Sequence, residues 1–342
     1  MMSVAVSRPH DGLKDLHGRG MNIRSDVYKL PVDEEEHNRL TIQHRIWKLM
    51  LGGSTGLYPP DVEPIVKQLL KPTTGSADSP SVLDLGSGSG IWAAEMAAMH
   101  PNVTVVGIDL AEPKLLTIPK NCRFLIADFT KDLEEFAETF DIVHCRCVAG
   151  HVIDRTGLLR QIAKLLKPGG LLLLGDGNLQ IFSSDRTVVS PASSLDFIGV
   201  ADKPEPASRD PIYIALWLEQ VIKYMLTNTL DPDHAGGGFL DTLVTSEPAL
   251  EYFGGRAYYS PIRPEGENSG SPSRIAQELS ALTERNMLNF LAASRPILLS
   301  RGLPHETVDE WQARARKDIL EPGVYWSMRW NLVWALKRRI EA

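Results

Sequence analysis

The sequence predicts an α/β protein whose core is a doubly wound, mostly parallel β-sheet. Between residues 81 and 178, short apolar segments typical of strands alternate with segments typical of helices. Strands that are apolar along their whole length indicate a parallel sheet with helices on both faces. A glycine-rich turn at 86–90 follows the first strand, and sheets of this kind bind ligands beyond the carboxyl ends of their strands. We expect an N-terminal helical cover before this core and a helical insertion after its fifth strand.

The composition limits the class of protein. The chain has 342 residues, enough for two domains or one enlarged domain. A formal net charge of −7 and a hydrophobic content of 43% exclude a largely disordered chain. The charge also argues against a nucleic-acid partner bound through a broadly basic surface. No apolar run reaches the roughly 18 residues of a membrane span, so no membrane partner is expected.

Cysteine content and the N-terminus indicate the compartment. The three cysteines, Cys122, Cys145 and Cys147, are too few for a disulfide framework. We expect them to be reduced and to pack as small hydrophobic side chains. Residues 1–24 lack the apolar segment of a signal peptide. The expected location is therefore cytoplasmic.

The segment before the core is expected to form a flexible tail at 1–24 and the helical cover at 25–75. Asp33 can cap a helix, and Glu36 three residues later completes a variant of the capping box. The side chains spaced for one face of this helix are Leu40, His44, Trp47 and Leu51.

The core is expected to comprise 76–178 and 295–338. Its strands are predicted at 81–85, 103–108, 123–127, 140–144 and 171–174, with helices at 91–99 and 158–166. A helix at 304–320 and an aromatic-rich strand at 324–336 close the chain.

The stretch at 179–294 is expected to be a helical insertion that caps the substrate. Its helices are predicted at 212–226 and 274–293, between irregular stretches at 183–211 and 231–273. Irregular segments this long in a compact protein are usually functional covers or mobile segments.

The glycine turn carries a specific signal. Gly86, Gly88 and Gly90 give the spacing G-x-G-x-G, which differs from the G-x-G-x-x-G fingerprint of dinucleotide-binding proteins. Asp84 lies two residues before the first glycine. A carboxylate there is unhelpful beside a pyrophosphate but suits a ligand that carries ammonium and sulfonium groups.

Two further acids end the next strands. Asp109 follows the second strand, placed to accept hydrogen bonds from both hydroxyls of a ribose. Asp128 follows the third strand and can accept from the amino group of adenine, while Phe129 can pack on the ring. A lone Asp at a strand end is usually a turn residue, but three in order beside a glycine turn indicate a nucleoside site.

These motifs resemble those of class I S-adenosylmethionine-dependent methyltransferases, which have a Rossmann-like sheet. The set comprises Asp84 to Gly90, Asp109, Asp128-Phe129, the strand at 140–144 and Leu166 to Gly170. A narrower resemblance, to fungal LaeA-type methyltransferases, comes from Tyr28 to Asp33, Arg39-Leu40, Gln43-His44 and Gly90-Ile91-Trp92. The match fades after Asn178, where the methyl acceptor should be chosen.

The resemblance implies S-adenosylmethionine as the cofactor. The cofactor-binding residues that it implies, together with the strand-end pattern, are Tyr28, Asp84, Gly86, Ser87, Gly88, Asp109, Leu110, Asp128, Phe129 and Arg146. Arg146 follows the fourth strand, where it can bind the carboxylate of the cofactor or an anionic acceptor.

Methyl transfer from a sulfonium is an in-line displacement, so catalysis depends on positioning the acceptor. An acceptor hydroxyl or amine must also lose a proton. His151 is the first candidate for the base and His144 the second, while Asp176 can orient the acceptor together with Asn178. Each has a structural alternative: a loop contact for His151, a satisfied strand histidine for His144, an ion pair for Arg146 and a plain turn for Asp176.

Two aromatic features stay open at this point. Tyr28, Gln43 and His44 form either a lid over the cofactor or part of a helix that only packs on the sheet. Trp217, Tyr224 and the Tyr258-Tyr259 pair line either an aromatic acceptor pocket or the core and a dimer contact.

The sequence therefore predicts an O- or N-methyltransferase acting on a small acceptor, an aromatic or polyketide-like secondary metabolite. No metal site is expected, because no cluster has metal-ligand spacing, and a homodimer is a further expectation. Two alternatives remain: a protein-modifying or regulatory methyltransferase that works in a complex, and a module that binds the cofactor without turnover. A nicotinamide oxidoreductase is disfavoured by the glycine spacing and by Asp84.

Overall fold

The computed structural model describes residues 13–72, 79–131, 133–191, 211–225, 237–263, 273–323 and 325–339. Residues 1–12 of the tail predicted at 1–24 and most of the irregular stretch predicted at 183–211 lie outside the described residues, as do 226–236 and 264–272.

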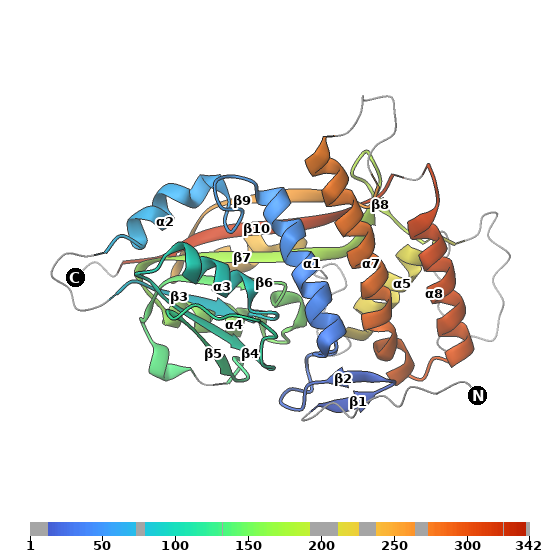
Figure 1. The fold of residues 1–342 in the computed structure, drawn as a ribbon, viewed down its shortest axis with the longest axis horizontal. Helices are drawn as coiled ribbons and strands as arrows, with labels where there is room; N and C mark the ends of the chain where they lie inside the picture. Colours follow the sequence, from blue (N-terminus) through green and yellow to red (C-terminus); the bar gives the residue numbers. More distant parts are fainter. Residues whose placement is uncertain are drawn as a thin grey trace.

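A twisted mixed sheet forms the centre of the molecule (Figure 1). Its strands are β3 (Ser81–Leu85), β4 (Thr104–Asp109), β5 (Cys122–Ile126), β6 (Phe140–Arg146), β7 (Leu166–Phe182), β8 (Val188–Val189), β9 (Leu250–Pro261) and β10 (Ser327–Lys337). The order is β5-β4-β3-β6-β7-β10-β9, and β8 pairs with the end of β7. The first five strands in this order are parallel, whereas β10 runs antiparallel to both of its neighbours. The predicted fold class, a doubly wound, mostly parallel Rossmann-like sheet, is confirmed.

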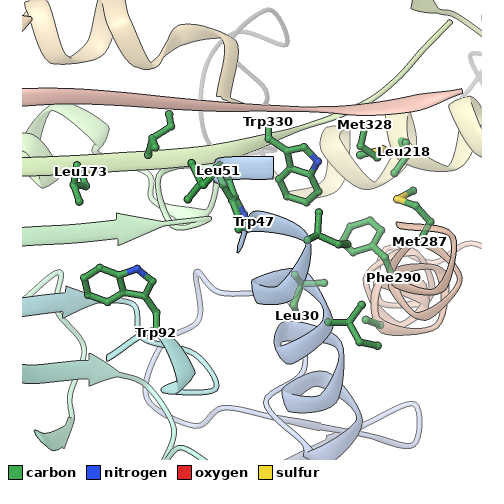
Figure 2. Close-up of a cluster of buried hydrophobic side chains, with 14 of the residues drawn as sticks. Leu30, Trp47, Leu51, Trp92, Leu173, Leu218, Met287, Phe290, Met328 and Trp330 are labelled. Carbon is green, nitrogen blue, oxygen red and sulfur yellow. The ribbon is translucent and has the colours of Figure 1, made fainter. Parts of the chain in front are cut away.

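Helices cover both faces of the sheet. One face packs against α1 (Glu34–Leu51), α2 (Glu63–Leu69), α3 (Ile91–Met99), α5 (Tyr213–Met225), α7 (Arg274–Ser300) and α8 (His305–Leu320). The other face packs against α4 (Arg155–Leu165) and α6 (Leu240–Thr245). Figure 2 shows part of the hydrophobic core on the first of these faces, where α1 and α7 meet the sheet. Trp47 lies beside Trp330 there, with ring centroids 5.4 Å apart.

Helix α1 begins as its sequence predicts. The Asp33 carboxylate accepts the backbone N–H of Glu36 at 3.0 Å, which satisfies one of the donors left free at a helix start. Three acids in the first turn suit the helix dipole. Gly52 ends the helix with φ +60°, a conformation that glycine adopts without steric cost.

The predicted flexible tail is wrong where the structure describes it. β1 (Lys14–Leu16) and β2 (Arg19–Met21) form an antiparallel hairpin. Arg19 binds the Asp33 carboxylate through Nε at 2.7 Å and Nη2 at 2.8 Å, which fastens the hairpin to the start of α1. This pairing joins residues that are 14 positions apart, so local sequence patterns gave no sign of it.

The predicted boundaries of the insertion are also wrong. Helix α7 runs unbroken across the expected border at 294, with Pro296 inside it. The insertion is not purely helical, because β9 lies in the stretch predicted to be irregular and pairs along β10. Gly254 made this segment look irregular in the sequence, because glycine is unusual inside a strand. Glycine is required at this position, since a Cβ there would lie 2.5 Å from Nε1 of Trp334.

Among the described residues, no helix is both long and apolar enough to cross a bilayer. Cys122, Cys145 and Cys147 are free thiols.

Candidate active site

A cavity lies at the carboxyl ends of β3, β4, β5 and β6, where the strand order reverses. We call it the nucleoside cavity. Every predicted cofactor-binding residue lines it, and so do His144 and His151. Side chains from the segment before α1 and from α1 itself close it from the other side, including Tyr28, Glu36, Leu40 and Gln43.

The glycine turn forms the floor of this cavity. Gly86, Gly88 and Gly90 have φ of +74°, +54° and +76°, values that L side chains rarely adopt. The N–H groups of Gly86 and Ser87 both donate to the carbonyl of Ile108, at 2.8 and 3.0 Å. A Cβ on Gly86 would lie 2.3 Å from Cγ2 of Val148. Val148 therefore packs directly on the backbone of Gly86, and the turn has no room for a side chain at this position.

Gly86→Ala is expected to destabilise the protein by about 2 kcal/mol or more and to abolish nucleoside binding, because it combines backbone strain with a steric clash. Thermal unfolding and calorimetric titration with S-adenosylhomocysteine measure the two effects. Gly302→Ala is the matched control: φ is +85° but nothing lies within 4 Å of the added Cβ. If Gly86→Ala binds as tightly as the Gly302→Ala control, the turn is not the ligand floor.

The acid at the end of β4 is tied to the turn. Asp109 accepts the N–H of Gly88 on Oδ2 and that of Leu110 on Oδ1, both at 2.7 Å. Burial raises the pKa of the Asp109 carboxyl, against the lowering effect of these hydrogen bonds. A carboxylate oxygen can accept more than one hydrogen bond, so Asp109 can also bind the hydroxyls of a ribose.

The acid after β5 is less buried. Oδ1 of Asp128 accepts from the backbone N–H of Thr130 at 3.1 Å and from its hydroxyl at 2.6 Å, while Lys131 lies 3.5 Å from Oδ2. Phe129 next to it is buried and lines the cavity.

Asp84 and His144 both line the cavity and are joined by a hydrogen bond. Nδ1 of His144 donates to Oδ1 of Asp84 at 2.7 Å, and the imidazole ring stacks on Trp92 with centroids 3.8 Å apart. Burial lowers the pKa of His144, so the ring is neutral near pH 7. The other carboxylate oxygen of Asp84 is buried without a hydrogen-bond partner in the described structure.

Arg146 presents the complementary group. Its Nη2 donates to Nδ1 of His44 at 3.0 Å, and its guanidinium lies over the ring of Trp47. Its Nη1 is buried and has no hydrogen-bond partner among the described residues, and the same holds for Oγ of Ser87. A free buried acceptor at Asp84 and a free buried donor at Arg146 match the ammonium and carboxylate of an amino acid. These residues fit the methionine end of S-adenosylmethionine, and the acids beyond the turn fit its nucleoside.

A second cavity adjoins the first, and we call it the acceptor cavity. It lies between α1, α5, α7, the end of β7 and β10. Its polar lining includes Arg39, Gln43, His151, Asp176, Asn178 and Asn286. Its apolar lining includes Met225, Met287, Phe290, Met328 and Trp330. Tyr28, Leu40, Gln43, Cys147 and His151 line both cavities, so the two cavities meet at these residues, and we call this boundary the passage.

Two titratable groups border the acceptor cavity with different pKa values. Burial raises the pKa of Asp176 to about 6, although the N–H groups of Gly150 and Gly177, each at 2.9 Å, oppose the rise. Burial lowers the pKa of His151 to about 4, helped by Arg39 and Arg155. His151 packs against Tyr28 with ring centroids 5.0 Å apart.

The structure distinguishes between the two interpretations of Trp217, Tyr224 and the Tyr258-Tyr259 pair, an acceptor pocket or packing residues. Trp217 and Tyr224 pack in the core, where Nε1 of Trp217 donates to Ser294, and they line neither cavity. Tyr258 and Tyr259 also lie outside both linings. The interpretation of these side chains as packing residues is therefore the one that the structure supports.

Sequence reasoning missed several lining residues. Arg39 forms a buried ion pair with Glu36 through two hydrogen bonds of 2.9 and 2.6 Å, and its Nη1 donates to Asn286 of α7. Arg39 appeared only as part of the LaeA-type pattern, and nothing in the sequence of α7 marked Asn286 or Phe290. Cys147, predicted to pack as a small hydrophobic side chain, lies in the passage with φ +57°. Within the described ranges, no three His, Cys, Asp or Glu side chains converge as metal ligands would.

Comparisons with known proteins indicate a methyltransferase domain. The methyltransferase domain family matches residues 59–190. The chain is 26% identical over 306 residues to the secondary metabolism regulator laeA of Coprinopsis cinerea, which covers 88% of this chain and 67% of that protein. It is 33% identical over 174 residues to the methyltransferase pytC of Aspergillus terreus, covering 50% of this chain and 49% of the relative.

A third relative is the protein-methionine methyltransferase laeA of Emericella nidulans, 34% identical over 147 residues, or 43% of this chain and 35% of that protein. The matches to the latter two relatives thus span half or less of their lengths. Among solved structures, a phosphoethanolamine N-methyltransferase 2 of Haemonchus contortus aligns with a TM-score of 0.41 and 15% identity, covering 90% of this chain and 59% of that chain. That likeness is too distant to support a conclusion.

The fold and the nucleoside cavity define a methyltransferase that uses S-adenosylmethionine. Residues 59–190 match the methyltransferase domain family, and the chain is similar to the LaeA-type proteins.

Proposed function

We propose that this enzyme methylates a hydroxyl or amine of a small, largely apolar acceptor, such as an aromatic or polyketide-like secondary metabolite. The observation that carries this proposal is the acceptor cavity, which meets the nucleoside cavity at a passage formed by shared residues. When bound, S-adenosylmethionine supplies an electrophilic methyl group on sulfur. Holding the acceptor beside that group in a water-poor site is the main catalytic task of the protein.

We assign the cofactor contacts by charge and position. Asp109 binds the ribose, Asp128 and Phe129 bind the adenine, and the free oxygen of Asp84 with Nη1 of Arg146 binds the amino-acid end. Gly86, Ser87, Gly88 and Leu110 supply the surrounding turn and strand end, and Tyr28 closes the site from the N-terminal segment.

Asp176 is the best candidate for the group that takes the proton of the acceptor. A base works best when its pKa lies near the operating pH, and the pKa of Asp176 is about 6 whereas that of His151 is about 4. His151 in the passage then orients the acceptor, together with the ring of Tyr28. His144 holds Asp84 and does not line the acceptor cavity, so we assign it a positioning role.

A protein acceptor is the second candidate. A relative of this chain bears the name protein-methionine methyltransferase, and the chain could act in a complex as a regulator. We favour a small molecule because the acceptor cavity lies between helices and the sheet. Helices α1 and α7 lie side by side (Figure 1), and side chains of both line the acceptor cavity.

Filling the acceptor cavity tests the proposal. Met287→Trp adds a large ring at a buried lining position and is expected to reduce methylation of a small acceptor at least ~100-fold, because the ring excludes the acceptor. The affinity for S-adenosylhomocysteine should change less than about twofold. Met99→Trp, at an exposed position of α3, is the control.

The acceptor itself is identified by mass spectrometry of metabolites that accumulate when the gene is deleted. An unmethylated intermediate, converted by the purified protein and not by Met287→Trp, is the expected result. Methylation of a protein partner at equal rates by the wild type and Met287→Trp would contradict a small-molecule acceptor in this cavity.

A further inference from the structure

A set of side chains behind Arg146 has no role in the assignments above. They are His44, Trp47 and Lys48 of α1 and Glu95 of α3. The His44 side chain is only 3% exposed, and it lies between the guanidinium of Arg146 and the carboxylate of Glu95. A buried histidine between a cation and an anion calls for an explanation.

The hydrogen bonds fix the tautomer of His44. Arginine can only donate, so Nδ1 of His44 must accept from Nη2 of Arg146 at 3.0 Å. The ring proton then lies on Nε2, which faces Oε2 of Glu95 at 3.3 Å. Burial lowers the pKa of His44 to about 4, and nearby Arg146 adds to this, so the ring is neutral near pH 7.

Glu95 is held in turn from α1. Nζ of Lys48 donates to the same Oε2 at 2.6 Å. Burial opposes ionisation of Glu95, but the neighbouring His44 and Lys48 prevail and lower its pKa to about 2. The charged carboxylate therefore lies close to Nε2 of His44, which makes no hydrogen bond among the described residues, and the ring is oriented by its hydrogen bond with Arg146.

The two terminal nitrogens of the Arg146 guanidinium differ in their contacts. Its Nη2 donates to His44 and its guanidinium lies over Trp47, while the buried Nη1 has no partner among the described residues. Arg146 as a residue lines the nucleoside cavity. A guanidinium held in this way loses less freedom when it binds a carboxylate.

We infer that His44 is a positioning residue, which accepts from Arg146 and aims its free Nη1 at the carboxylate of the bound cofactor. The inference rests on the proposed cofactor contacts and adds to them that α1, outside the sheet, sets the recognition of the amino-acid end. Affinity for that end of the ligand, and not for the nucleoside, should then depend on His44.

Two ligands separate the two ends. S-adenosylhomocysteine carries the amino-acid carboxylate, whereas 5′-methylthioadenosine keeps the nucleoside and the sulfur but lacks the carboxylate. By isothermal titration, His44→Leu is expected to bind S-adenosylhomocysteine about 10-fold more weakly and 5′-methylthioadenosine within about twofold of the wild type. Arg146→Met should show the same selectivity with a larger loss.

Variants that keep polarity separate the two ring nitrogens. His44→Asn retains an acceptor near the position of Nδ1 and should recover most of the affinity for S-adenosylhomocysteine. His44→Gln reaches toward Glu95 in place of Arg146 and should show the selective loss, which keeps the test available if His44→Leu does not fold. Arg45→Leu removes the neighbouring exposed ion pair with Glu278 and should change neither affinity.

Equal weakening of both ligands in the His44 variants would show a merely structural role and overturn the inference, as would no weakening of either. A wild-type protein that binds neither ligand would instead contradict the proposed cofactor contacts themselves. The two failures are therefore distinguishable.

Discussion

Asp109→Ala is expected to weaken the binding of S-adenosylhomocysteine at least ~100-fold, because hydrogen bonds to a charged acceptor contribute about 1.5–3 kcal/mol each and a ribose makes two. The substitution also releases the N–H groups of Gly88 and Leu110, which now donate to the two carboxylate oxygens. The glycine turn then loses its tie to β4. Isothermal titration calorimetry measures the effect directly.

A matched control exists at the opposite end of the sheet. Asp141 accepts the backbone N–H of Ser81 and the Nζ of Lys167, both at 2.8 Å, and lines neither cavity. Asp141→Ala also removes a carboxylate that binds a backbone N–H but should leave the affinity for S-adenosylhomocysteine within about threefold. Equal losses in the two variants would mean that Asp109 acts through stability and not through the ligand.

Asp176→Asn is expected to lower kcat for a hydroxyl acceptor by about 10²–10⁴, because it removes the proposed base. Binding of S-adenosylhomocysteine should persist, since Asp176 lines only the acceptor cavity. The base must be ionised to act, and its pKa is raised to about 6. Wild-type activity should therefore rise with pH through about 6, level off above it, and fall as the carboxylate is protonated below it.

Asp154 provides the control for Asp176. It caps α4, accepts the N–H of Gly157 at 2.7 Å, and is largely exposed. Asp154→Asn should keep the full rate and the pH dependence. If Asp176→Asn retains the wild-type rate and its inflection near pH 6, the base lies elsewhere and His151 becomes the first candidate again.

The parts of the site that follow strand ends were predictable from the sequence. Asp84, Asp109 and Asp128 each follow or end a strand, and the carboxyl ends of parallel strands meet at one edge of the sheet. They converge on one cavity because β3, β4 and β5 are neighbours in the sheet, an order that the structure supplies. Asp33 capped its helix as predicted because capping acts within one turn.

The rest depended on contacts between distant segments. Arg39 meets Asn286 across 247 positions, and Arg19 meets Asp33 across 14. Strand β9 forms because β10 offers a partner edge and Gly254 leaves room for Trp334, a condition set by tertiary packing. Likewise, we rank Asp176 above His151 as the base because burial raises the pKa of the first and lowers that of the second. The residue types and their spacing in the sequence do not determine this burial.

A crystal structure of the protein with S-adenosylhomocysteine tests the central claim most directly. The expected result is ribose on Asp109, adenine beside Asp128 and Phe129, the carboxylate on Nη1 of Arg146, and sulfur at the passage between Tyr28 and His151. A nucleoside bound in any other cavity, or a sulfur atom turned away from that passage, would contradict the account.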